Sequence, residues 1–226
     1  MISLSPRLQA VLDLCQALHT PDRGILADIG TDHGYLPISA VQNGIFKYAY
    51  ACDLHPAPLA IAAENIRSAG LTNKIETRLG DGLKPFDEAD CIVIAGMGGM
   101  RIWGIINEGM AQAKKAKRLI LQPQHDTVLL RKNLHSAGFE IQDERMIHEI
   151  VGGKSHFYVV IAARYTGLAE KWTEQEYFLG KFLLASAGEV FSVYKKHERD
   201  KIKSYIARIN DEASLKNANE HLHWLE

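Results

Sequence analysis

The sequence contains few cysteines and no cysteine pair. Only three occur among 226 residues, Cys15, Cys52 and Cys91, and none has the CxxC spacing of a metal or redox motif. Each lies in an apolar run, which predicts a small buried side chain in a reducing compartment. A chain of this length buries roughly 70% of its unfolded surface, so it needs no disulfide or structural metal for stability. We therefore expect no metal site.

Long hydrophobic runs and a charge imbalance are also missing. The apolar runs have the length of strands, well short of the ~20 residues that span a bilayer. The N-terminus has no basic region ahead of a long apolar run. These absences predict a cytoplasmic protein with no membrane association. The chain carries 26 Lys and Arg against 27 Asp and Glu, a net charge of −1, so a polyanion would have to bind to a local basic patch.

Short apolar runs that alternate with helical patterns make up most of the chain. A first helix is expected from Ser5 to Leu18, with Ser5 as its N-cap. Between Gly24 and Tyr165, helical patterns such as Leu59–Ala69 and Met100–Ala111 separate runs of strand length, as in repeated βαβ units of a parallel sheet. The predicted strands are Ile25–Ile29, Tyr48–Asp53, Ile75–Leu79, Cys91–Ala95, Arg118–Gln122, Phe139–Ile147 and Phe157–Arg164.

The last two predicted strands differ from the others, because the residues between them are too few for a helical crossover. Gly152 and Gly153 instead predict a tight turn, and therefore an antiparallel hairpin at one end of the sheet. Apolar residues then recur at helical spacing in Trp172–Ala187, Glu189–Ile209 and Leu215–Leu225. We expect an α/β domain over residues 1–165. An all-helical C-terminal domain over residues 166–226 would form a helical hairpin with a coiled-coil-like seam.

The strongest functional signal is the segment Ile25–Tyr35, in which a predicted strand runs into a glycine turn ahead of a helix. Gly30 lets backbone approach a ligand, and Gly34 lets the helix pack on the strand, so backbone N–H groups at the helix N-terminus meet the ligand. Asp28 at the strand end would repel a pyrophosphate but attract the ammonium and sulfonium groups of S-adenosylmethionine. Asp32 also replaces the middle glycine of the dinucleotide fingerprint. The segment therefore favours S-adenosylmethionine as the cofactor.

Acidic residues follow the next two predicted strands as well. Asp53 ends the second strand, where a carboxylate can accept hydrogen bonds from both ribose hydroxyls. Asp81 lies within Gly80–Leu83 after the third strand, and it could accept a hydrogen bond from the adenine amino group. Taken singly, each of these aspartates is better explained as a solvated turn residue. Acids after successive strands predict one cofactor crevice at the carboxyl ends of the sheet, closed by the hairpin typical of class I methyltransferases.

The fourth predicted strand ends in Gly96-Met97-Gly98-Gly99, at the position that faces the methyl acceptor in such enzymes. The Asn/Asp-Pro-Pro-aromatic tetrad of enzymes that methylate amino groups in nucleic acids is missing there. The glycines predict a low, open floor on which a base could lie flat, although Met97 and Met100 could simply pack below it. After the fifth strand, the amides of Gln122 and Gln124 could read a base edge or cap the next helix.

These motifs together resemble the bacterial tRNA (adenine-N1)-methyltransferase family that acts at tRNA position 22. The resemblance extends from residue 4 to about residue 165, and over the tail it rests on the helical architecture alone. It implies a class I methyltransferase domain with S-adenosylmethionine as methyl donor and an adenosine in tRNA as acceptor. The segments that carry the resemblance are Asp28–Pro37, Gly80–Leu83, Ile94–Gly99 and Leu119–Pro123.

The motifs and the resemblance together assign residues to the two halves of the predicted site. Because N1 of adenine has a free lone pair, positioning can supply most of the catalysis, and a nearby carboxylate would stabilise the positive charge that forms. We prefer Asp28 to Asp32 for this catalytic role, although Asp28 could equally be only a cofactor ligand. The predicted substrate-binding residues are Arg7, Met97, Gly98, Gly99 and Gln122. The predicted cofactor-binding residues are Asp28, Gly30, Asp32, His33, Gly34, Asp53, Leu54, Asp81, Gly82 and Gly96.

Several basic residues are candidate contacts to tRNA phosphates, although charge runs of this kind are also common on solvated helix faces. Two other functions stay open: a class I methyltransferase for another RNA, a protein or a small molecule, and a non-catalytic module that binds RNA or an adenosyl ligand. A monomer or a weak homodimer is expected. The basic candidates are Arg7, Lys114–Arg118, Arg131, Lys132, Lys195, Lys196, Arg199, Lys201 and Lys203.

Overall fold

The computed structural model describes residues 3–17, 24–168, 170–208 and 211–226. By their mutual contacts, these residues divide into two compact units. The first comprises Met1–Ile147 and Tyr158–Glu170, and the second comprises His148–Phe157 and Lys171–Glu226. This division assigns the tip of the predicted hairpin to the helical unit, whereas the sequence placed all of residues 1–165 in the first domain. The boundary at residue 165 stays a prediction.

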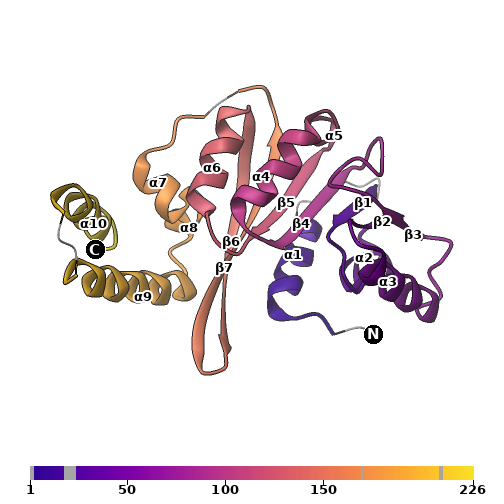
Figure 1. Ribbon diagram of the computed structural model, residues 1–226, viewed down its shortest axis with the longest axis horizontal. Helices are drawn as coiled ribbons and strands as arrows, with labels where there is room; N and C mark the ends of the chain where they lie inside the picture. Colours follow the sequence, from indigo (N-terminus) through magenta and orange to yellow (C-terminus); the bar gives the residue numbers. More distant parts are fainter. Residues whose placement is uncertain (1–2, 18–23, 169, 209–210) are drawn as a thin grey trace. The chain divides into compact units, whose positions relative to one another are not determined.

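Within the described residues, seven strands form one sheet in the order β3-β2-β1-β4-β5-β7-β6 (Figure 1). Strands β1 to β5 pair in parallel, and β7 pairs antiparallel to β5. The predicted α/β fold is confirmed. The strands are β1 (Ile25–Ile29), β2 (Tyr48–Asp53), β3 (Ile75–Leu79), β4 (Cys91–Met97), β5 (Arg118–Pro123), β6 (Phe139–Val151) and β7 (Lys154–Tyr165).

The order of the strands decides where the helices of the first unit lie. The chain runs outward from β1 to β3 and then returns to β4 on the other side of β1. Because such crossovers are right-handed, the helices of the two halves cover opposite faces of the sheet. The reversal between β1 and β4 opens a crevice at the carboxyl ends of the strands. The helices are α1 (Pro6–Ala17), α2 (Tyr35–Gln42), α3 (Pro56–Ser68), α4 (Gly99–Glu108), α5 (Met110–Lys115) and α6 (Thr127–Ser136).

Apolar side chains on both faces of the central strands form the core of this unit. Leu26, Ile92 and Ile120 are fully buried, as expected for strands covered by helices on both sides. The cysteines lie buried with free thiols, which agrees with the prediction from their apolar surroundings. The predicted helix Met100–Ala111 is instead two helices, α4 and α5, separated by Gly109. A Cβ at Gly109 would lie 2.6 Å from Cβ of Leu83. Close packing against Leu83 therefore requires a glycine where the periodic pattern predicted a continuous helix.

Helix α1 brings the N-terminal segment to the sheet. The Ser5 hydroxyl accepts a hydrogen bond from the Leu8 N–H at 3.3 Å, which supports the predicted N-cap. Val11 and Leu14 on the buried face are fully enclosed, and α1 contacts β5. Leu18, the predicted last residue of this helix, lies outside the described residues.

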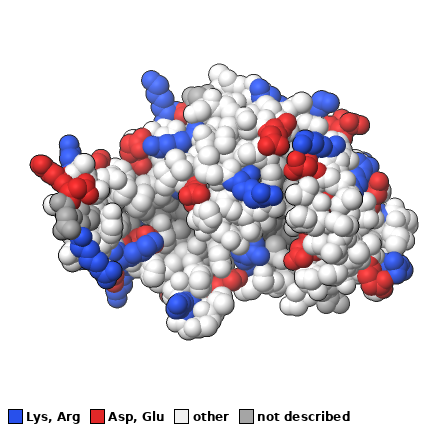
Figure 2. Space-filling model, viewed as in Figure 1, with Lys and Arg blue, Asp and Glu red and all other residues white. Residues whose placement is uncertain are grey.

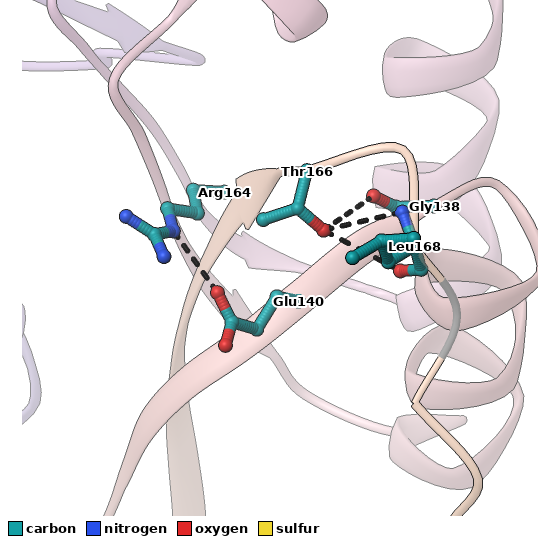
Figure 3. Close-up of polar contacts among 5 residues, drawn as sticks. All are labelled: Gly138, Glu140, Arg164, Thr166 and Leu168. Atoms are coloured by element: carbon teal, nitrogen blue, oxygen red, sulfur yellow. Dashed lines mark hydrogen bonds and ion pairs between the residues drawn. The ribbon is translucent and has the colours of Figure 1, made fainter.

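The hairpin of β6 and β7 is confirmed, with its turn at Gly152 and Gly153. At the base of the hairpin, Arg164 Nε donates a hydrogen bond to Glu140 Oε2 at 3.0 Å (Figure 3). Thr166 follows β7, and its backbone N–H donates to the carbonyl of Gly138 at 3.0 Å. The chain that leaves β7 is therefore attached to the start of β6.

The second unit contains the C-terminal helices α7 (Glu174–Leu179), α8 (Lys181–Ser186), α9 (Glu189–Ile206) and α10 (Glu212–Trp224). The predicted single helix Trp172–Ala187 is wrong, because Gly180, with φ of 94°, separates α7 from α8. Phe178 of α7 stacks on His221 of α10 with ring centres 4.2 Å apart. Helices α9 and α10 are in contact, while the coiled-coil seam stays a prediction. Ile209, the predicted end of α9, lies outside the described residues.

Charged side chains of both signs lie on the surface. On the face drawn in Figure 2, Lys and Arg are interspersed with Asp and Glu. Among the described residues, no helix combines the length and the apolar character needed to cross a bilayer.

Candidate active site

A cavity of about 450 Å³ lies at the carboxyl ends of the central strands in the first unit. Residues that follow β1, β2, β3 and β4 contribute to its wall, as the switch point between β1 and β4 requires. The structure thus brings together most of the predicted site residues. Those that line the cavity are Arg7, Asp28, Gly30, Asp32, His33, Asp53, Leu54, Asp81, Gly82, Gly96 and Met97.

The turn between β1 and α2 forms the floor on the side predicted to hold the cofactor. The N–H groups of Gly30 and Thr31 both donate to the carbonyl of Cys52, at 2.9 and 3.0 Å, which ties the turn to β2. Asp32 adopts a left-handed conformation with φ of 51°. Gly34 has φ of 72° and caps the N-terminus of α2. A Cβ at Gly34 would lie 3.2 Å from Cβ of Ala62, so this glycine sets the distance between the turn and α3.

Replacing Gly34 with alanine is expected to destabilise the protein by about 2–4 kcal/mol, through left-handed strain and contact with Ala62. Gly70 is a matched control, because its φ is 69° and a Cβ there would meet nothing within 4 Å. Gly70→Ala should therefore cost only the strain, about 1–2 kcal/mol. Urea denaturation of both variants measures the difference, and equal losses would show that packing on α3 is unimportant.

Asp28, at the end of β1, is a nearly buried carboxyl with 5% of its surface exposed. Its Oδ2 accepts a hydrogen bond from the Thr31 hydroxyl at 2.7 Å. Burial raises the pKa of Asp28 from 3.8 to about 7; the Thr31 hydrogen bond opposes this rise, and the charge of Asp53 adds to it. A cation that binds beside this carboxyl favours its ionised form. The site is therefore suited to a positively charged ligand.

Asp53, at the end of β2, is held by backbone groups. Its Oδ1 accepts from the N–H of His55 at 2.9 Å, and its Oδ2 accepts from the N–H of Asp32 at 3.4 Å. These contacts orient the carboxylate between the turn after β1 and the start of α3. An oriented carboxylate at this strand end can accept hydrogen bonds from the two hydroxyls of a ribose.

Asp81 lies in the loop after β3, and Arg78 of β3 holds this loop in place. Arg78 Nη1 donates to the carbonyl of Pro85 at 2.9 Å, and the Arg78 guanidinium lies 3.7 Å from the centre of the Tyr50 ring. A hydrogen bond and ion pair with Lys84, 2.8 Å away, lowers the pKa of Asp81. Asp81 is therefore ionised, its side chain is half-exposed, and it lines the cavity together with Gly82.

Gly96 marks the side of the cavity predicted to face the methyl acceptor. Its N–H donates to Oε1 of Gln122 at 3.0 Å, and Arg7 Nη1 donates to the same oxygen at 2.6 Å. Gln122 is fully buried and does not line the cavity. Its carboxamide thus joins the N-terminal helix to the end of β4, and the predicted direct contact between Gln122 and substrate stays a prediction.

Gly98 and Gly99 also lie outside the cavity lining, and both pack against the loop after β5. A Cβ at Gly98 would lie 2.5 Å from Cε1 of His125, and a Cβ at Gly99 would lie 2.6 Å from the carbonyl oxygen of Asp126. The open floor expected over these glycines is therefore occupied by His125 and Asp126. Substrate contact by Gly98 and Gly99 stays a prediction, and Gly34 is likewise behind the wall.

Several cavity residues were not assigned to the site from the sequence. Thr31 lies within the glycine motif, and its distance of three residues from Asp28 was the available signal. Gln124 and Gln122 are equivalent amides in the sequence, and no pattern distinguishes the one that lines the cavity. Arg101 carried no signal, because only the fold places α4 beside the loop of Asp81. All three line the cavity.

The structure excludes part of the basic set predicted to contact phosphates. Arg131 is wrong as a candidate, because its side chain is 2% exposed and its Nε donates to Glu144 Oε1 at 2.7 Å. Lys117 pairs with Asp90 at 2.8 Å. The run Lys114–Arg118 ends at the first residue of β5, and so lies at the amino edge of the sheet, opposite the cavity. Among the candidates in the first unit, Arg7 is placed at the cavity.

The fold and the cavity together define a class of protein. The strand order reverses between β1 and β4, β7 runs antiparallel to β5, and Asp28, Asp53 and Asp81 at strand ends surround one cavity. This arrangement is that of a Rossmann-like class I methyltransferase, which uses S-adenosylmethionine. Residues 26–225 match the model of the TrmK family, tRNA (adenine(22)-N(1))-methyltransferase. The chain belongs to this family, as the sequence motifs predicted.

Individual relatives agree with this assignment. The chain is 37% identical over 164 residues to the tRNA (adenine(22)-N(1))-methyltransferase of Bacillus subtilis; the match covers 72% of this chain and 66% of that enzyme, just under two thirds of its length. A candidate tRNA (m1A22) methyltransferase of Streptococcus pneumoniae, solved in complex with S-adenosyl-L-methionine, superposes with a TM-score of 0.86 at 30% identity, over 99% of this chain and 98% of that one. TrmK of M. capricolum, in complex with S-adenosylhomocysteine, gives 0.82 at 29% identity over 98% and 96%.

Proposed function

We propose that this protein transfers a methyl group from S-adenosylmethionine to N1 of adenosine 22 in tRNA. The observation that carries the proposal is the arrangement of Asp28, Asp53 and Asp81 around one cavity, in a chain that belongs to the TrmK family. The protein acts in the cytoplasm as a monomer or a weak homodimer.

The residues around the cavity fit this cofactor. Its volume of about 450 Å³ lies within the range of roughly 300–1,000 Å³ typical of small-molecule sites. Asp28 attracts the sulfonium and ammonium groups, Asp53 accepts from the ribose hydroxyls, and Asp81 accepts from the adenine amino group. The other proposed cofactor contacts are Gly30, Asp32, His33, Leu54, Gly82 and Gly96, which line the cavity, whereas Gly34 acts by holding the turn from behind its wall.

Methylation at N1 of adenine needs orientation more than proton transfer, because the attacking lone pair is already free. S-adenosylmethionine, when bound, supplies an electrophilic methyl group. The chain holds the base in line with this group, and a well-oriented pair of reactants is worth roughly 7–11 kcal/mol. Positive charge moves onto the base as the new bond forms. The Asp28 carboxylate stabilises that charge from a nearly buried position, where water screens it little.

On the acceptor side, Arg7 and Met97 line the cavity, and Gly98, Gly99 and Gln122 lie behind its wall. Arg7 reaches the cavity from α1 and is held there by Gln122. The basic side chains Lys195, Lys196, Arg199, Lys201 and Lys203 of α9 contact tRNA phosphates in the second unit. Affinity for tRNA should then fall as the salt concentration rises. The slope of log K against log salt concentration should be about −0.7 for each single-strand phosphate neutralised.

The function is tested by incubating the protein with radiolabelled S-adenosylmethionine and unmodified tRNA, followed by nucleoside analysis. Label should appear in 1-methyladenosine with the wild-type transcript and be lost when adenosine 22 is replaced by guanosine. Label in another nucleoside, or label that survives this replacement, would overturn the assignment. Binding of tRNA that does not change with salt would count against RNA as the substrate.

A further inference from the structure

Polar side chains converge over Gly96, on the acceptor side of the cavity. Gly96 has φ of 79° and no side chain, and a Cβ placed there would lie 3.4 Å from Arg7 Nη1 and 4.0 Å from Gln124 Nε2. The guanidinium and the amide therefore face the same stretch of bare backbone. Both residues line the cavity, as Gly96 does. A base that enters from this side meets these two groups.

The two glutamines after β4 and β5 differ in what their amides can do. Gln122 is fully buried; its Oε1 accepts from Arg7 and from Gly96, and its Nε2 donates to the carbonyl of Pro123 at 2.9 Å. Gln124 is exposed at the cavity. Its backbone N–H donates to the carbonyl of Met97 at 2.9 Å, which fixes where the side chain begins. Gln122 therefore supports the wall, and the Gln124 amide faces the ligand space.

The chemistry of adenine favours the amide over the guanidinium as the group that identifies the base. N1 must stay free to attack, so recognition has to use another edge. On its major-groove edge, adenine presents the N6 amino donor beside the N7 acceptor, and a glutamine amide pairs with both at once. The amide is also neutral, whereas a cation beside the ring would oppose the positive charge that N1-methylation creates.

We propose that Gln124 is a specificity-determining residue that selects adenine, with its amide oxygen accepting from N6 and its amide nitrogen donating to N7. This proposal rests on the proposed function. Guanine presents O6 and N7, two acceptors, at the same edge. One end of the Gln124 amide would then face an acceptor without a donor, and an unmatched polar group of this kind disfavours binding.

The test uses tRNA that carries either adenosine or 7-deazaadenosine at position 22, because 7-deazaadenosine lacks the N7 acceptor and keeps N1 and N6. Wild-type protein should lose about tenfold in kcat/KM on the 7-deaza substrate. Gln124→Ala should lose about 5- to 150-fold on adenosine. It should then show no further loss on 7-deazaadenosine, because its partner for N7 is gone.

Two controls separate recognition of the base from other effects. Gln42→Ala, at the exposed end of α2 and outside the cavity lining, should behave as wild type on both substrates. Calorimetric affinity for S-adenosylhomocysteine should be the same for Gln124→Ala and wild type. A wild-type protein that makes no 1-methyladenosine would overturn the proposed function itself. If wild type is active, equal rates on both substrates, or a tenfold loss that persists in Gln124→Ala, would overturn the role of Gln124 alone.

Discussion

Replacing Asp28 with asparagine is expected to abolish most methyl transfer and, above pH 7, to make the protein more stable by about 4 kcal/mol. The two effects share one cause. Burial raises the pKa of Asp28 to about 7, so the folded protein pays to keep this carboxyl ionised. Asparagine can still accept the Thr31 hydrogen bond, but it carries no charge to attract a cationic cofactor or to stabilise a cationic product.

The pH dependence of this stabilisation follows from the sign of the pKa change. The unfolded Asp28 releases its proton near pH 3.8 and the folded one near pH 7. Between these values the folded state holds more protons, so wild-type stability falls as the pH rises. At about 1.36 kcal/mol per pH unit, the loss is complete above pH 7 and amounts to about 4 kcal/mol. Asp28→Asn should match wild type below about pH 4 and exceed it increasingly up to pH 7.

Urea denaturation at pH 4, 6 and 8 measures this difference. Asp81→Asn is the control, because Asp81 is half-exposed and paired with Lys84, and its stability should not show the same rise with pH. A wild-type protein more stable than Asp28→Asn at pH 8 would contradict the conclusion that burial of the ionised Asp28 carboxyl destabilises the folded state. In activity assays, kcat/KM should fall roughly 100- to 1,000-fold. A loss confined to KM for S-adenosylmethionine would make Asp28 a cofactor ligand only.

The second large effect is expected at Arg131, where substitution by methionine should destabilise the protein by about 3–5 kcal/mol. Arg131 of α6 and Glu144 of β6 are 2% and 0% exposed, and Arg131 Nε donates to Glu144 Oε1 at 2.7 Å. Removing the arginine leaves the Glu144 carboxyl buried without its ion pair. The double variant Arg131→Met with Glu144→Leu should recover most of the loss, since an apolar pair can replace a buried ion pair at little cost.

The control for Arg131 is the ion pair of Arg164 and Glu140 at the base of the hairpin (Figure 3). Its side chains are 50% and 41% exposed, so Arg164→Met should change stability by about 0–1 kcal/mol. Urea denaturation at pH 7.5 compares the three variants. If Arg131→Met lowers the free energy of unfolding no more than Arg164→Met does, the buried ion pair of Arg131 and Glu144 does not stabilise the fold as proposed.

The sequence determined the fold of the first unit because local signals and burial agreed there. The predicted ends of β1, β2 and β3 coincide with those observed, since each is an extended run bounded by turn residues or by a helix. The hairpin followed from Gly152 and Gly153, with too few residues around them for a crossover. In the helical unit the pattern was less decisive, because Gly180 interrupts a run that is otherwise periodic.

The grouping of the three aspartates around one cavity was predictable for the same reason. Asp28, Asp53 and Asp81 each follow a strand, and parallel strands end at one edge of a sheet. Their positions along the chain were enough to predict that they surround one cavity, and their charge favoured S-adenosylmethionine as its ligand. Only the tertiary structure showed that Asp28 is nearly buried while Asp81 is half-exposed, and therefore that similar residues have opposite pKa changes.

The acceptor side depended on the tertiary structure throughout. Arg7 and Gln122 are 115 residues apart, and no local pattern records that they share a hydrogen bond. Gln122 and Gln124 are equivalent amides in the sequence, yet one is enclosed by β4 and α1 and the other faces the cavity. Periodicity and turn chemistry report on neighbours along the chain, and they were therefore enough to place the three aspartates at one edge of the sheet. Which side chains meet across the sheet is decided by packing, because contacts between distant segments exist only once the chain has folded.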